Sequence, residues 1–198
     1  MSSKIFTPLG ASNHTKQVRE INDFYATSPE AVCHLIEGGG AKIPQVIYEP
    51  ACGNGCLSEI LKAKYGRKVY SHDIVDRGYG EGVKDFFQTK ESPKDCNCIL
   101  TNPPYSLATE FIIHSLNLLK EDGLCIMFLK TTFLEGKNRY EKLFSKCPPM
   151  FVYQFIQRVQ CAKDAKFDQM KAGGGSAVAY AWYVFKKGYK GDTIVRWI

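Results

Sequence analysis

The sequence lacks a long hydrophobic run and a secretion signal. Its longest uninterrupted apolar stretch, LCIMFL from Leu124, is far shorter than the roughly 20 apolar residues of a membrane-spanning helix. The first residues, MSSKIFTPLGASN, do not follow the basic and then apolar order of a signal peptide. Both absences argue against a membrane or secreted protein, and we expect the chain to act in the cytoplasm with no membrane partner.

The sequence also lacks a cysteine pattern that would predict a metal site or a disulfide framework. It has eight cysteines, but Cys52, Cys98 and Cys125 lie inside or beside apolar runs that are typical of core strands. No paired C-x-x-C motifs and no histidine-rich segment accompany them, which argues against zinc. We therefore expect reduced thiols, an intracellular protein and no metal.

The sequence has no tail of one charge sign, although the chain is basic overall. The formal net charge is +6, and the excess is spread along the chain. This excess suits a polyanionic partner, but many enzymes of small acidic metabolites are equally basic. The length of 198 residues, of which 44% are hydrophobic and 23% charged, is enough for one well-buried core. We predict a mobile arm over residues 1–22 and a single domain over residues 23–198.

Strand-like and helix-like segments alternate through the middle of the chain, which predicts an α/β fold with a mainly parallel sheet. The last two strong strands have no helical pattern between them, so we expect an antiparallel pair at one edge. Residues 158–175, RVQCAKDAKFDQMKAGGG, are predicted to form a long basic loop. Strands are expected within residues 45–49, 68–73, 96–101, 124–129, 150–156 and 177–185, and helices within 28–37, 55–66, 106–119 and 138–146.

A glycine-containing turn, EPACGNG, joins the first of these strands to a helix. Gly53 and Gly55 would let the backbone approach a ligand, and the helix N-terminus behind them presents free N–H groups. Dinucleotide-binding turns have a third glycine, where this chain has Ser58. The acid before the turn, Glu49, would repel a pyrophosphate but attract an ammonium or sulfonium cation. A tight turn that binds no ligand is the alternative interpretation.

Two further acids strengthen the ligand interpretation. Asp73 ends the second strand of this unit, where a carboxylate can accept hydrogen bonds from ribose hydroxyls. Asp85, followed by Phe86, could hold an adenine amine while the ring covers the base. A nucleoside with a cationic tail like an amino acid fits these residues, and S-adenosylmethionine is such a molecule.

The segment ILTNPPYS places two prolines directly after a short apolar strand. Asn102 would lie at the carboxyl end of that strand and so in the ligand crevice of an open parallel sheet. Pro103 and Pro104 stiffen the backbone, so the Asn102 side chain and the Pro103 carbonyl become two fixed acceptors suited to an –NH2 group. Tyr105 could then stack on the ring that carries the amine. Alternatively, the prolines only end the strand and Asn102 caps the following helix.

At these residues the sequence resembles the class I S-adenosylmethionine-dependent methyltransferases, and most of all the small phage-type DNA adenine-N6 methyltransferases. The resemblance covers about residues 23 to 188 and implies a Rossmann-like class I methyltransferase fold. That fold has a mainly parallel seven-stranded sheet with an antiparallel C-terminal edge pair, and helices on both faces. The resemblance implies a catalytic tetrapeptide of Asn102, Pro103, Pro104 and Tyr105, and cofactor contacts from Phe24, Tyr25, Thr27, Glu49, Ala51, Gly53, Gly55, Asp73, Asp85 and Phe86.

The implied reaction is in-line methyl transfer to the N6 amine of an adenine flipped out of DNA. An amine in RNA, a glutamine amide in a protein, and a cofactor-binding subunit without activity remain alternatives. No separate recognition domain is evident, so DNA contacts are expected from basic residues near the crevice and in the predicted loop: Lys130, Lys137, Arg139, Arg158, Lys163 and Lys166. The recognised DNA sequence and the oligomeric state are not predicted.

Overall fold

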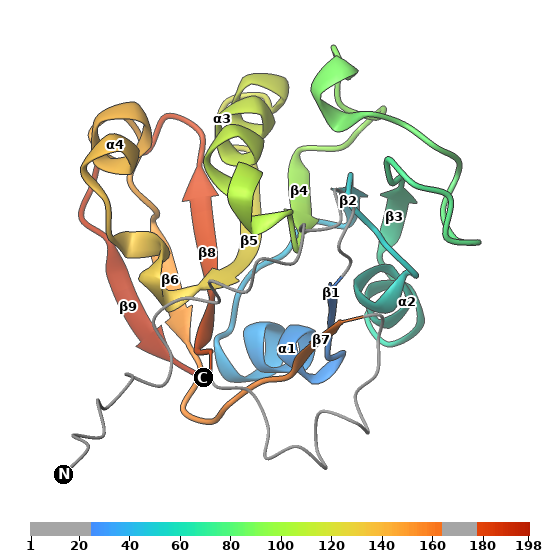
Figure 1. Ribbon diagram of the computed structural model, residues 1–198, viewed down its shortest axis with the longest axis horizontal. Helices are drawn as coiled ribbons and strands as arrows, with labels where there is room; N and C mark the ends of the chain where they lie inside the picture. The colour runs from blue at the N-terminus through green and yellow to red at the C-terminus, as the bar shows by residue number, and fades with distance from the viewer. Residues whose placement is uncertain (1–24, 164–177) are drawn as a thin grey trace, which may run out of the picture.

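The apolar runs in the middle of the sequence form the buried strands of a seven-stranded sheet (Figure 1). The computed structural model describes residues 25–163 and 178–198. The strand order across the sheet is β3-β2-β4-β5-β8-β6-β9. These strands are β2 (Val46–Glu49), β3 (Lys68–Ser71), β4 (Cys98–Thr101), β5 (Leu124–Lys130), β6 (Phe151–Gln154), β8 (Tyr180–Lys186) and β9 (Ile194–Trp197).

The pairing within the sheet confirms the predicted mixture of parallel and antiparallel strands. β2 runs parallel to both β3 and β4, and β4 runs parallel to β5. β8 lies antiparallel between β5 and β6, and β9 pairs in parallel with β6 as the outermost strand. The antiparallel pair is therefore close to one edge, as predicted. β9 was not predicted from the sequence.

Helices cover both faces of the sheet, which also agrees with the prediction. One core contains side chains of α1 (Glu30–Cys33) and α2 (Cys56–Ala63), and the opposite core contains side chains of α3 (Ala108–Leu118). The strands alternate between these two cores, since Leu100 faces the first and Ile99 the second. The remaining helical segments are η1 (His34–Gly38), η2 (Phe86–Gln88), η3 (Tyr105–Leu107), η4 (Thr131–Leu134), α4 (Lys137–Arg139) and η5 (Tyr140–Phe144).

A separate two-stranded ribbon lies beside α1 in Figure 1 and was not predicted. Its strands are β1 (Tyr25–Thr27) and β7 (Cys161–Lys163), and they pair antiparallel with Thr27 opposite Cys161. The predicted loop over residues 158–175 is therefore wrong in part, because residues 161–163 satisfy their backbone groups by pairing with β1. The rest of that loop from residue 164 to 175, like the predicted arm over residues 1–22, lies outside the described residues.

Two features of the described residues bear on the predictions from composition. None of the helices in residues 25–163 and 178–198 is long and apolar enough to cross a membrane. All eight cysteines are free thiols, and five of them are buried: Cys52, Cys96, Cys98, Cys125 and Cys161.

Candidate active site

The carboxyl ends of β2, β3 and β4 meet at one edge of the sheet because these strands are parallel neighbours. Two hydrogen bonds tie the glycine turn after β2 to the neighbouring strands. The Gly53 amide donates to Asp73 Oδ2 over 2.8 Å, and Thr101 Oγ1 donates to the Ala51 carbonyl over 3.4 Å. The turn, Asp73 and the start of the Asn-Pro-Pro-Tyr segment are thus brought together as the sequence predicts.

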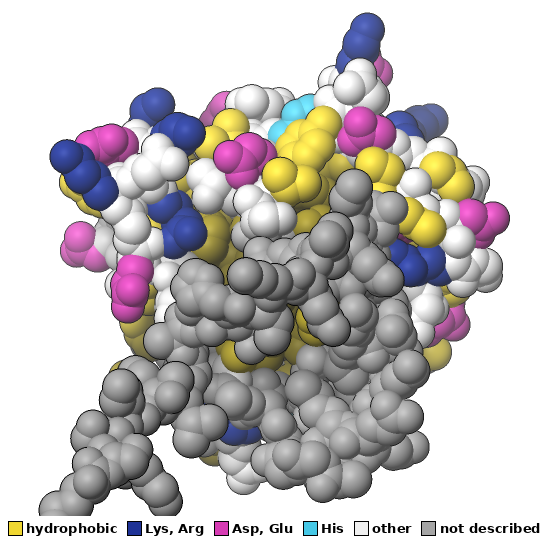
Figure 2. Space-filling model, in the orientation of Figure 1, with side chains coloured by type: hydrophobic (Ala, Val, Ile, Leu, Met, Phe, Trp, Pro, Cys, Tyr) yellow, Lys and Arg dark blue, Asp and Glu magenta, His cyan; other side chains and the backbone are white. Residues whose placement is uncertain are grey.

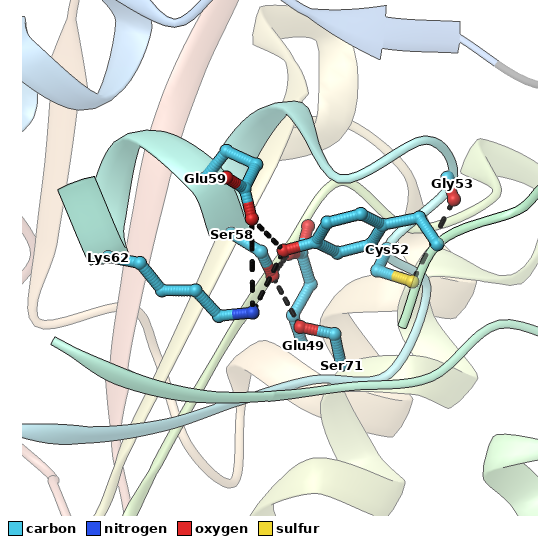
Figure 3. A network of polar contacts seen from close by, with 8 residues as sticks. Glu49, Cys52, Gly53, Ser58, Glu59, Lys62 and Ser71 are labelled. Carbon is cyan, nitrogen blue, oxygen red and sulfur yellow. Dashed lines mark hydrogen bonds and ion pairs between the residues drawn. The ribbon is translucent and has the colours of Figure 1, made fainter. Parts of the chain in front are cut away.

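The glycine turn needs glycine for two physical reasons. Gly53 and Gly55 have φ values of 56° and 85°, which favour glycine. A Cβ atom on Gly55 would also lie 2.5 Å from the ring of Tyr79, which belongs to the loop after β3. The Tyr79 hydroxyl donates to Glu59 over 2.6 Å and accepts from Lys62 over 2.9 Å. Figure 3 shows Glu59 and Lys62 on the same side of α2, so both can reach this hydroxyl.

Glu49 lies beneath the turn instead of pointing into an open crevice. Its side chain is 1% exposed and accepts a hydrogen bond from Ser58 of α2 (Figure 3). The Ser58 hydroxyl is in turn 2.6 Å from that of Ser71 at the end of β3. The pKa of Glu49 is raised to about 8, mainly by burial, with a smaller contribution from the charge of Asp73, while the Ser58 hydrogen bond opposes the shift. At neutral pH Glu49 is therefore mostly an uncharged acid, whereas the sequence argument took it to be a carboxylate.

Asp73 is held in place by the backbone on both of its oxygens. Oδ2 accepts from Gly53, and Oδ1 accepts from the Val75 amide over 3.0 Å. Each carboxylate oxygen keeps a second lone pair for an additional donor. The next side chain in the sequence, the apolar Ile74, is 57% exposed. Ile74 was not predicted as a site residue, although an apolar residue directly after the acid was the available signal.

Asp85 and Phe86 lie at the turn that leads into η2. Asp85 Oδ1 accepts from the Phe87 amide over 2.9 Å and begins η2. Phe86 is 3% exposed, and its ring centroid is 4.8 Å from that of Phe111. The more exposed ring is that of Phe87, which the sequence argument passed over.

A shallow groove of about 390 Å³ lies beside this turn. It runs between η2 and α3, and its lining is mainly apolar: Phe87, Leu107, Glu110, Ile113, His114 and Asn117. Figure 2 shows hydrophobic side chains gathered next to a histidine on this face, between α3 and the segment that follows β3.

Asn102 has a fixed orientation that leaves one polar atom unsatisfied. Its Nδ2 donates to the Tyr25 carbonyl over 2.8 Å and lies 3.6 Å from Cys161 Sγ. Its Oδ1 is buried and has no hydrogen-bond partner within residues 25–163 and 178–198. The opposite amide orientation would place Oδ1 against the Tyr25 carbonyl, and two acceptors repel each other at that distance. The side chain does not cap the following helix, which was the alternative interpretation.

Tyr105 begins η3, and its hydroxyl points into the protein. The hydroxyl is 3.3 Å from Cys161 Sγ, and burial raises the pKa of the phenol well above its usual value. The ring is 6.0 Å from that of Tyr180, and Lys130 Nζ lies 5.2 Å from the ring centroid. Tyr105 thus stays protonated at neutral pH, and its ring contacts a cation.

The other predicted cofactor residues belong to β1 or precede it. Tyr25 contributes its backbone carbonyl to Asn102, while its side chain is partly exposed. Thr27 is buried within the ribbon. Phe24 lies outside the described residues.

The residues predicted to contact nucleic acid differ in whether their side chains are exposed. Lys137 is highly exposed and lies 3.9 Å from Glu141, and Arg158 is exposed. Arg139 instead folds back onto its own turn, where it donates to the carbonyls of Phe133 and Glu135 and covers the Phe133 ring. Lys163 belongs to β7, and Lys166 lies outside the described residues.

Several solved structures with this architecture are described as methyltransferases. A type I restriction-modification methyltransferase subunit from Streptococcus thermophilus matches with a TM-score of 0.61 and 14% identity, over 90% of this chain and 48% of that chain. A predicted O-methyltransferase from Agrobacterium tumefaciens matches with a TM-score of 0.56 and 11% identity, over 86% of this chain and 85% of that one. A Listeria monocytogenes protein described as a class I S-adenosylmethionine-dependent methyltransferase has a TM-score of 0.53 and 11% identity, over 86% and 64% of the two chains.

These likenesses define the fold of the chain. It has the class I methyltransferase fold, with a seven-stranded sheet and helices on both faces. The chain spans about half of the length of the Streptococcus thermophilus subunit. No protein-family model matches the sequence, and no curated protein sequence matches it.

Proposed function

We propose that this chain is an S-adenosylmethionine-dependent methyltransferase that modifies the exocyclic N6 amine of adenine in DNA. The observation that carries the proposal is the buried Oδ1 of Asn102, which has no hydrogen-bond partner among the described residues and whose direction is set by the hydrogen bond from Nδ2 to the Tyr25 carbonyl. An unsatisfied buried acceptor is costly, and the N–H of an incoming amine would satisfy it.

The groups around Asn102 favour an amine as the methyl acceptor. The Asn102 amide oxygen and the Pro103 carbonyl are neutral acceptors, and hydrogen bonds to them draw the amine lone pair out of the ring system. The amine proton becomes acidic only as the new N–C bond forms, so no base is needed beforehand. The adjacent groups are not bases at neutral pH, since burial raises the pKa of both the Tyr105 phenol and the Cys161 thiol. The chain therefore contributes positioning and electrostatic stabilisation.

The residues near the carboxyl edge of the sheet and at η2 would suit the parts of S-adenosylmethionine. The Asp73 carboxylate, oriented by two backbone amides, has lone pairs for the ribose hydroxyls. Asp85 would accept from the adenine amine, and the exposed side chains of Ile74 and Phe87 would contact the base. Glu49 and the turn at Gly53 would lie at the amino-acid end. When bound, the cofactor supplies a methyl group activated by its positive sulfur.

Three features support DNA as the substrate. The net charge of +6 suits a polyanion. Lys130 contacts the ring of Tyr105, and this ring is the surface on which a flipped base would stack. One structure of the same fold is a restriction-modification methyltransferase subunit.

The test is transfer of a tritiated methyl group to unmethylated DNA, RNA and protein in parallel, followed by identification of the labelled nucleoside or amino acid. We expect N6-methyladenine from DNA. A label found only in RNA or on glutamine would contradict the proposed substrate. Cofactor binding without transfer to any of the three would contradict enzymatic activity.

A further inference from the structure

Cys161 of β7 contacts two residues of the Asn-Pro-Pro-Tyr segment. It is 1% exposed, and its sulfur lies 3.6 Å from Asn102 Nδ2 and 3.3 Å from the Tyr105 hydroxyl. β7 is held in place by its pairing with β1 and by the hydrogen bond from the Ser28 amide to the Gln160 carbonyl. The thiol therefore approaches the segment from a fixed support.

The contact with Asn102 completes the hydrogen bonding of the amide nitrogen. One N–H of Nδ2 donates to the Tyr25 carbonyl, and Cys161 Sγ is within reach of the other. Sulfur is a weak acceptor, so this second contact contributes direction more than strength. Because both N–H groups are occupied on the side of the β1–β7 ribbon, Oδ1 is turned to the other side, where no described residue is its hydrogen-bond partner.

The same sulfur also limits where the ring of Tyr105 can lie. The phenol is buried at its hydroxyl end, between the thiol and the neighbouring ring of Tyr180. A shift of this hydroxyl would rotate the ring on which a base is expected to stack. Cys161 thus links the acceptor that would bind the amine to the platform that would hold the base.

We propose that Cys161 is a positioning residue that fixes the amide of Asn102 and the ring of Tyr105 relative to each other for methyl transfer. The proposal rests on the function proposed above. The thiol forms and breaks no bond in the reaction. Burial raises its pKa, so it remains a neutral thiol that neither attacks the cofactor nor accepts the amine proton.

The kinetic test compares C161A and C161S with the wild type. C161A leaves an N–H of Asn102 and the Tyr105 hydroxyl without their sulfur partner, and we expect kcat to fall by about 10- to 100-fold, since small misplacements of reacting groups are costly. The KM for S-adenosylmethionine should stay within about twofold, because the residues proposed to bind it are untouched. C161S restores a polar partner, so its kcat should lie between those of C161A and the wild type.

Cys125 offers a matched control for the loss of a buried thiol. It is fully buried on β5 and belongs to the core on the α3 side, whereas Cys161 belongs to the opposite core. C125A removes a buried sulfur atom that is not among the hydrogen-bond partners of Asn102 or Tyr105, so its kcat should remain within about twofold of the wild type. An equal loss of kcat in C125A and C161A would overturn the proposal, because general destabilisation would then explain both.

A second measurement decides the question independently of activity. The side-chain NH2 signals of Asn102 can be identified in NMR spectra as the pair that N102A lacks. We expect this pair to broaden or exchange faster in C161A and to stay near the wild-type values in C161S and C125A. Unchanged Asn102 signals in C161A, or wild-type kcat in C161A, would overturn the proposal. If the wild type transferred no methyl group, the proposed function would fail, while the NMR result would still decide whether Cys161 positions Asn102.

Discussion

Replacing Glu49 by glutamine should change how the stability of the protein depends on pH. Glu49 is 1% exposed, accepts a hydrogen bond from Ser58, and has a pKa raised from 4.5 to about 8 by burial. In the unfolded chain its pKa returns to that of an ordinary glutamate. Between these two pKa values the folded state keeps a proton that the unfolded state releases, so the free energy of unfolding falls as the pH rises.

The size of the effect follows from the size of the pKa shift. Each pH unit within this window removes about 1.4 kcal/mol, so the full window from pH 4.5 to about 8 corresponds to an effect on the order of 5 kcal/mol. Other carboxyl groups also change stability with pH, and the useful quantity is therefore the difference between the wild type and E49Q. Glutamine has nearly the same shape and a hydrogen-bonding amide but does not titrate, so E49Q lacks this dependence.

The assay is urea unfolding of both proteins at intervals from pH 4.5 to pH 8.5. Near pH 4.5 the two proteins should be similarly stable, since Glu49 is protonated in the folded state. Towards pH 8 the wild type should lose several kcal/mol relative to E49Q, in proportion to pH. A difference between the two proteins that does not vary with pH would refute the account of Glu49 as a buried, uncharged acid.

Two further predictions concern packing around the site. G55A should destabilise the protein by about 1–3 kcal/mol or more, because a Cβ atom at this position would lie 2.5 Å from the Tyr79 ring. The control G66A also has a positive φ, but its Cβ would have no atom within 4 Å, so it should destabilise the protein less. Equal losses of stability in urea unfolding would contradict the steric argument. W182F should lower the free energy of unfolding by about 2–4 kcal/mol, because Trp182 is fully buried and donates to the Ala31 carbonyl over 2.8 Å. W197F should lower it by less than about 0.5 kcal/mol, because Trp197 is 69% exposed. Equal urea midpoints for the two variants would contradict this prediction.

The sequence predicts the central strands because they are buried on both faces. Runs such as LCIMFL become β5, whose inner residues face two cores, and a continuous apolar run is the expected signature of such a strand. β9 lacks that signature, since its four residues are all exposed at the edge of the sheet. The ribbon strands β1 and β7 have three residues each, which is too short for a period to be read.

The position of site residues along the chain was predictable, but the direction of their side chains was not. Asp73 and Asn102 follow parallel strands, so their shared edge could be inferred from the order of the segments. The hydrogen bond of the buried Glu49 comes from Ser58 of another element, and Ser58 in turn contacts Ser71. The orientation of Asn102 depends on Tyr25 and Cys161, which are far from it in sequence. Such long-range contacts leave no local pattern in the sequence.

Single-turnover methyl transfer by N102A tests the central claim most directly. The variant removes the unpartnered acceptor, which would act on the amine and not on the cofactor. We expect the rate of transfer to adenine in DNA to fall by about 100-fold or more, with the affinity for S-adenosylmethionine within about threefold of the wild type. The matched control is N97A, at the other end of β4, where Asn97 Oδ1 accepts from the Lys120 amide, and its rate should stay near that of the wild type. A wild-type rate in N102A would contradict the account.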